Sequence, residues 1–70
     1  MYRVTFKGSD QYASSDRMAK FLLDYCHDRY GDNDNAVAHA MDLGLQLYNA
    51  PLTLARRGKS IKITYLGESK

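Results

Sequence analysis

Apolar and polar residues alternate at the start of the chain. The apolar positions are Tyr2, Val4 and Phe6. The polar positions between and after them are Arg3, Thr5 and Lys7. Because successive side chains of a strand point to opposite faces, this pattern predicts a β-strand over residues 2–7 with one apolar and one basic face. Gly8 interrupts the pattern, and a loop is expected from there to about Ser14.

A second alternation lies near the other end of the chain, from Ser60 to Leu66. Its apolar positions are Ile61, Ile63 and Tyr65. Residues 52–54 alternate more weakly, and residues 55–59 are typical of a turn because they contain Gly58. The sequence therefore predicts a β-hairpin over residues 52–66. Whether its first arm, residues 52–55, is a strand stays open.

Between these segments, apolar residues recur with the period of an α-helix. The first stripe consists of Met18, Phe21, Leu22 and Tyr25. Ser14 or Ser15 can cap this helix, and Gly31 is the natural stop.

The second predicted helix begins within residues 32–35, where Asp and Asn side chains are suited to capping, and extends to about Asn49. Its apolar positions are Ala36, Val37, Ala40, Met41, Leu43, Gly44, Leu45, Leu47 and Tyr48. Because so little of its surface is polar, we expect this helix to be the more buried of the two. Gly44 suggests a close backbone approach, and Pro51 ends the helix.

These elements predict an α+β fold with two layers and the order β-α-α-β-β. A small antiparallel sheet of three strands would carry both helices on one face, in a single domain of residues 1–70. Seventy residues build only a small core, so dimerisation or docking on a partner would add stability.

Charge is distributed unevenly although the net charge is only +2. The two ends of the chain are basic and the middle is acidic. The strand face opposite the core is expected to be basic, which suits a binding surface for protein or nucleic acid, although many sheets simply have a solvated polar face. The predicted binding residues are Arg3, Thr5, Lys7, Arg56, Arg57, Lys59, Lys62 and Thr64.

Catalytic and metal-binding patterns are not found in the sequence. Cys26 and His27 are adjacent on one helix and diverge by about 100°, and no second cysteine is available for a zinc site. Cys26 is expected to pack as a small hydrophobic residue, and His39 to pair with Asp42 on the surface. The chain is therefore predicted to be neither an enzyme nor a metal or cofactor protein. Its single cysteine indicates the cytoplasm, and its short apolar runs exclude a membrane span.

One resemblance concerns the second predicted helix. Its residues 35–37, with Ala40, Gly44-Leu45 and Leu47, resemble the second helix of ribbon-helix-helix DNA-binding proteins. The resemblance implies a dimeric transcriptional repressor in which Arg3, Thr5 and Lys7 contact the major groove. Two features depart from that family: about seven residues separate the strand from the first helix, and a C-terminal hairpin follows.

The layout of the whole chain is similar to small phage-encoded inhibitors of the anti-CRISPR type. The features that carry this likeness are the helix from Ala36 to Tyr48, Pro51, and a C-terminal hairpin with residues 57–59 at its tip. The resemblance implies a stoichiometric inhibitor or adaptor of a host protein or ribonucleoprotein complex in the host cytoplasm. Nucleic-acid binding and a homodimer stay open, and a membrane partner is not expected.

Overall fold

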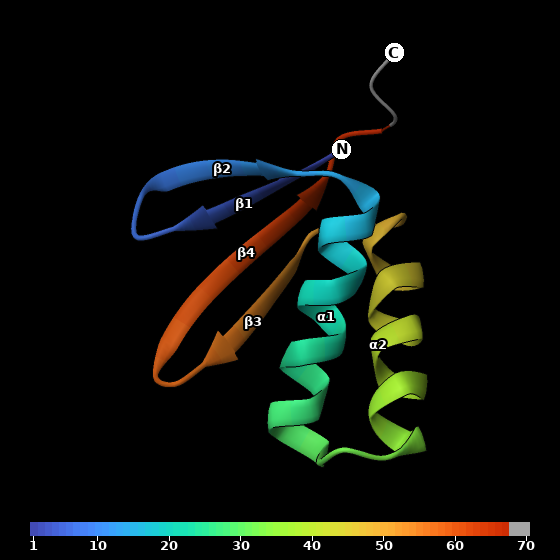
Figure 1. Ribbon diagram of the computed structural model, residues 1–70. Helices are drawn as coiled ribbons and strands as arrows, with labels where there is room; N and C mark the ends of the chain where they lie inside the picture. Colours follow the sequence, from blue (N-terminus) through green and yellow to red (C-terminus); the bar gives the residue numbers. More distant parts are fainter. Residues whose placement is uncertain (68–70) are drawn as a thin grey trace.

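The computed structural model describes residues 1–67 and has two layers, an antiparallel sheet and a pair of helices on one of its faces (Figure 1). The strands are β1 (Tyr2–Phe6), β2 (Ser9–Ala13), β3 (Leu52–Arg56) and β4 (Lys59–Tyr65). The helices are α1 (Ser15–Tyr30) and α2 (Asp34–Leu47). The predicted α+β fold is confirmed, with the expected elements in the expected order and one additional strand, β2.

The expected loop over residues 8–14 is wrong, because Ser9–Ala13 forms strand β2 beside β1. Lys7 and Gly8 both have positive φ angles, 50° and 79°. Such a two-residue turn matches the twist of an antiparallel hairpin, so the chain reverses at once. The sequence does not predict this strand because Ser, Asp and Gln have weak β-propensity. Its pairing with β1 stabilises the extended conformation.

The strand order is β2-β1-β4-β3, with every neighbouring pair antiparallel. Strand β1 is therefore central and has β2 on one side and β4 on the other. The predicted hairpin at residues 52–66 is confirmed, and its first arm, which the sequence left open, is strand β3. Its turn, Arg57 and Gly58, repeats the geometry of the first with φ angles of 53° and 77°. Both turns lie at the same end of the sheet, on the left in Figure 1.

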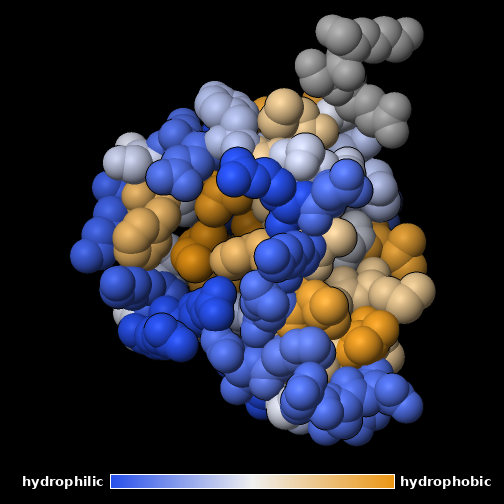
Figure 2. Space-filling view, in the orientation of Figure 1, coloured by the Kyte–Doolittle hydropathy of each residue, from blue (hydrophilic) through white to orange (hydrophobic). Residues whose placement is uncertain are grey.

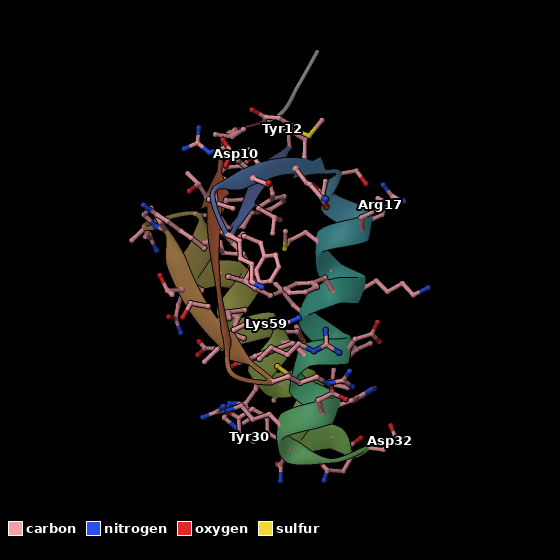
Figure 3. The ribbon with its side chains drawn as sticks, turned by 90° about the vertical axis from the view of Figure 1, so that its left-hand side faces the viewer. Asp10, Tyr12, Arg17, Tyr30, Asp32 and Lys59 are labelled. Atoms are coloured by element: carbon pink, nitrogen blue, oxygen red, sulfur yellow. The ribbon has the colours of Figure 1, made fainter. Side chains whose placement is uncertain are left out.

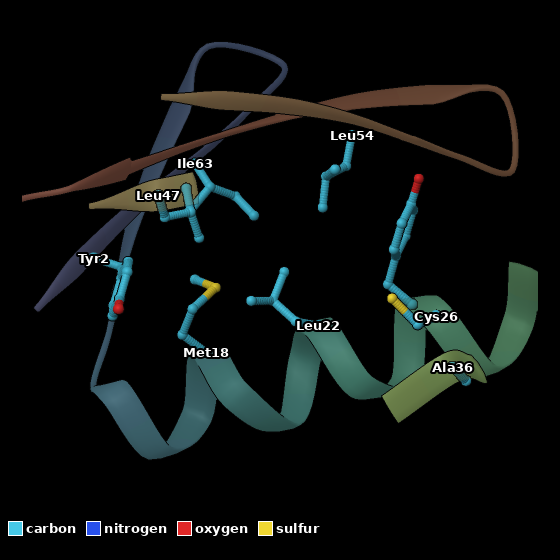
Figure 4. Packing of buried hydrophobic residues seen from close by; sticks show 9 residues of the cluster. Tyr2, Met18, Leu22, Cys26, Ala36, Leu47, Leu54 and Ile63 are labelled. Carbon is cyan, nitrogen blue, oxygen red and sulfur yellow. The ribbon is translucent and has the colours of Figure 1, made fainter. Parts of the chain in front are cut away.

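The core lies between the sheet and α1 (Figure 4). Its buried members are Tyr2, Met18, Leu22, Tyr25, Cys26, Ala36, Leu47, Leu54 and Ile63. Seven of the eight apolar positions predicted for the inner sheet face are confirmed there: Tyr2, Leu54 and Ile63 are buried, and Val4, Leu52, Ile61 and Tyr65 pack against them. The eighth, Phe6, is half-buried and does not belong to this cluster. The expectation for Cys26 is also confirmed, since its side chain has no exposed surface.

Both helices begin at residue types that the sequence indicated, and α1 also ends at one. Helix α2 ends at Leu47, two residues before the expected Asn49. Ser14 caps α1 by accepting from the Arg17 amide at 3.3 Å, and Gly31 follows the helix with a φ of 90°. Asn33 caps α2 by accepting from the amides of Asn35 and Ala36.

The expectation that α2 is the more buried helix is wrong. Helix α1 buries four side chains, whereas α2 buries only Ala36 and Leu47. Helix α2 lies beside α1 (Figure 1). Its apolar residues extend around more of its circumference than α1 and the sheet cover. The apolar residues that are left exposed to solvent are Val37, Met41, Leu45 and Tyr48.

Candidate binding surface

The outer face of the sheet, the side turned away from the helices, carries four of the eight predicted binding residues: Arg3, Thr5, Lys62 and Thr64. The β1–β4 register sets Arg3 opposite Thr64 and Thr5 opposite Lys62. The two cations thus lie on neighbouring central strands, each beside a threonine. Arg3 and Thr64 are half-buried, whereas Lys62 is exposed. The Arg3 guanidinium, the Lys62 ammonium and the Thr64 hydroxyl can donate hydrogen bonds to a partner.

Strand β2 adds two residues to this face that the predicted set lacked. Tyr12 is paired with Arg3, and Asp10 with Thr5. Tyr12 is exposed, and both side chains project from the first hairpin in Figure 3. The Thr5 hydroxyl donates to Asp10 Oδ1 at 2.7 Å. The outer face is therefore less one-signed than the sequence indicated, with one carboxylate near two cations. The sequence does contain a signal for these two residues: Asp10 and Tyr12 are two positions apart, so in a strand after Gly8 they share one face.

The other four predicted residues form a second group, the hairpin-tip cluster: Lys7, Arg56, Arg57 and Lys59. Arg56 alternates in phase with Leu52 and Leu54, so it projects on the helix side of the sheet. Its Nε and Nη2 donate to Asp28 Oδ2 of α1 at 3.0 and 2.6 Å. Arg57 Nη2 lies 4.0 Å from the same oxygen. Asp28 thus partly neutralises this cluster, which the sequence could not show because the residues are 28 positions apart.

The two lysines of the hairpin-tip cluster flank Phe6. The Nζ atoms of Lys7 and Lys59 each lie 5.5 Å from the centroid of its ring. Ammonium groups are attracted to the face of an aromatic ring, so these contacts orient both lysines around Phe6. In Figure 3, Lys59 projects toward the helix layer. The eight predicted residues therefore do not form one surface, because four lie on the outer face and four at the tip.

Charge is segregated between the two layers. The strands and their turns carry six cationic side chains and one carboxylate, Asp10. The two helices and the loop between them carry six aspartates and three cations. This arrangement makes the molecule electrically polar, since the sheet layer is basic and the helix layer is acidic.

The residues considered for metal or nucleophilic chemistry are dispersed. Burial raises the pKa of the Cys26 thiol. His27 Nε2 lies 3.5 Å from Asp32 Oδ1, and the ring of His39 stacks on Tyr30 with 4.0 Å between centroids. The expected pair of His39 with Asp42 is wrong, because Asp42 accepts from Gln46 instead. Within residues 1–67, no group of three potential metal ligands is found.

Among the described residues, no helix has the length and apolar character needed to cross a membrane.

Comparison with known proteins gave no match to a family model, a curated protein or a solved structure.

Proposed function

We propose that this protein is a small non-enzymatic binding protein that acts as a stoichiometric inhibitor or adaptor. Its outer sheet face would dock on a negatively charged region of a host protein or ribonucleoprotein complex. One observation carries the proposal: Arg3 and Lys62 stand on adjacent central strands of an uncovered sheet face, each beside a threonine hydroxyl. Basic groups on a rigid sheet steer an acidic partner and fix its orientation.

Binding is favoured over catalysis by the environments of the titratable groups. Active sites depend on groups with shifted pKa values that lie in a cleft. Here the two raised pKa values belong to Tyr2 and Cys26, both buried, and burial is the main cause of each. Tyr2 also lines a groove between α1 and α2, but its raised pKa favours the neutral phenol, which is not activated as a base or nucleophile. Among the described residues, no polar or charged side chain is buried.

A protein or ribonucleoprotein partner is favoured over a ribbon-helix-helix mode of DNA binding. In that mode, strands of two subunits pair to form the ribbon that enters the major groove. Strand β1 already pairs with β2 and β4 along both of its edges. The edges that a second subunit could use belong to β2 and β3, which do not carry Arg3, Thr5 and Lys7.

The test is a charge reversal of the outer face, Arg3→Glu/Lys62→Glu. Lys20→Glu/Arg29→Glu makes the same change in charge on α1 and is the matched control. A partner captured by the wild type from host lysate would be purified and titrated against all three proteins by calorimetry. We expect one-to-one binding, a loss of at least about tenfold for the sheet variant, and little change for the control.

Equal affinities of the two variants would contradict the proposed surface. Binding to short duplex DNA that falls steeply with salt, and that Arg3→Glu/Lys62→Glu abolishes, would instead support the repressor alternative.

A further inference from the structure

The helix layer contains an open apolar groove, which is separate from the outer face of the sheet. It has a volume of about 560 Å³ and lies between α1 and α2. Ala19 and Leu23 line it from α1; Val37, Met41 and Leu45 line it from α2. Figure 2 shows hydrophobic side chains gathered over the two helices, at the right of the view.

The α2 wall of this groove is strongly exposed. The exposed fractions are 43% for Val37, 67% for Met41, 65% for Leu45 and 58% for Tyr48. Val37, Met41 and Leu45 are four residues apart, so they form a ridge along one side of the helix. From Val37 to Tyr48 the ridge extends about 16 Å, or three helical turns. A contiguous exposed apolar surface of this kind is uncommon on a monomer and marks an interaction site.

The border of the groove is mostly acidic. Asp16 is the charged residue among its lining side chains. On α2, Asp34 lies at the start of the ridge, and Asp42 lies outside the groove lining, three residues before Leu45 and therefore beside it on the helix surface. Lys20, one turn after Asp16, is the opposing cation on α1. A partner that fills this groove therefore meets apolar walls with a net negative border.

We infer that the groove between α1 and α2 binds an amphipathic α-helix of a partner protein, one with aliphatic residues on one face and lysine or arginine along its margins. Aliphatic side chains at i, i+3 or i+4 and i+7 would pack against Val37, Met41 and Leu45. The basic margins would lie near Asp16 and Asp42. The inference does not rest on the proposed function of the sheet face.

A second copy of this chain matches the groove less well. Its helices offer apolar residues, but they would bring Asp16, Asp34 and Asp42 against the same aspartates. Its outer sheet face offers cations, but Tyr12 is the large exposed hydrophobic residue there. Neither surface supplies apolar anchors together with positive margins, whereas a basic amphipathic helix supplies both.

The inference is tested with two labelled helical peptides of about five turns that share one leucine face. The remaining positions are lysine in one peptide and glutamate in the other. Binding to the full chain is followed by fluorescence anisotropy. We expect saturable binding of the Leu/Lys peptide, weaker binding at high salt, and at least about tenfold weaker binding of the Leu/Glu peptide.

Three variants assign the binding to the groove. Met41→Gln/Leu45→Gln removes apolar anchors at exposed positions and should lower the affinity at least about tenfold. Tyr12→Gln/Leu66→Gln changes two other exposed hydrophobic residues and should bind as the wild type does. Asp16→Lys/Asp42→Lys leaves the apolar walls intact and should reverse the preference toward the Leu/Glu peptide. Circular dichroism confirms that each variant is folded.

Three results would overturn the inference. They are the absence of Leu/Lys binding, equal binding of the two peptides, and binding that Met41→Gln/Leu45→Gln leaves unchanged. Sedimentation gives a fourth, namely a wild-type dimer that the same variant dissociates, because a second copy would then occupy the groove. Arg3→Glu/Lys62→Glu should bind the peptide like the wild type, so the sheet and groove proposals fail independently.

Discussion

Tyr2 belongs to the core and to a pair of aromatic rings with Tyr65. It is buried, its ring lies 5.0 Å from that of Tyr65, and it also lines the groove between the helices. Burial raises the pKa of Tyr2 to about 12, and the neighbouring Tyr48 and Tyr65 contribute to the increase. A buried phenol loses hydration when it ionises, so its neutral form is favoured.

This shift predicts a loss of stability at high pH. Tyrosine in the unfolded chain has a pKa near 10.0, so between pH 10 and 12 unfolding releases a proton from Tyr2. The free energy of unfolding should therefore be unaffected by Tyr2 below pH 10 and fall as the pH rises to 12, by up to about 2 kcal/mol. Urea titrations of the wild type and Tyr2→Phe at pH 8 to 12 measure the effect. A variant that loses as much stability as the wild type would contradict it.

At the scale of elements, the two hairpins have the same type of turn, but the sequence predicted only the second hairpin. Both turns have a basic residue followed by glycine, and both pairs have positive φ. The second was predicted because Ile61, Ile63 and Tyr65 mark the strand after it. The first was missed because β2 contains no Val, Ile or Leu, and its extended form depends on hydrogen bonds to β1.

Glycine has a different role in the helices. Gly44 was expected to mark a close backbone approach, and this expectation is wrong. A Cβ atom at this position would lie 3.9 Å from Leu22 Cδ1, which is an ordinary contact. Its backbone has no positive φ, in contrast to Gly58 at 77°.

Gly44→Ala and Gly58→Ala should consequently change stability in opposite directions. The first should raise the free energy of unfolding by up to about 1 kcal/mol, because alanine is the better helix former. The second should lower it by about 1 kcal/mol, because an L-residue is strained in the left-handed region. Denaturant titrations of both variants test this. If Gly44→Ala is destabilising, the groove floor is tighter than the structure indicates.

At the scale of the whole molecule, the two layers are held together mainly by apolar packing. Asp28 forms the salt bridges between helices and sheet among residues 1–67, with Arg56 and Arg57. All three side chains are partly or largely exposed to water, which screens the attraction. Leu22, by contrast, is buried between the layers.

This contrast predicts very different costs for two substitutions. Asp28→Asn should lower the free energy of unfolding by less than about 1 kcal/mol. Leu22→Ala should lower it by about 2–5 kcal/mol, because it removes buried contacts and leaves a cavity. Chemical unfolding followed by circular dichroism measures both. Comparable losses would mean that the ion pair contributes more to joining the layers than its exposure indicates.

The sequence by itself determined the two helices, the residue types that cap their starts, strands β1 and β4, and most of the inner sheet face. These features follow from short-range periodicity and local hydrogen bonds. Only the tertiary structure decided which apolar residues are covered. Helix α2 has apolar residues around much of its circumference, and the placement of α1 leaves Met41 and Leu45 in water. The tertiary structure also decided that Asp10 lies beside Thr5 and Asp28 beside Arg56. Contacts between segments that are far apart in the chain depend on strand pairing and packing, not on local sequence.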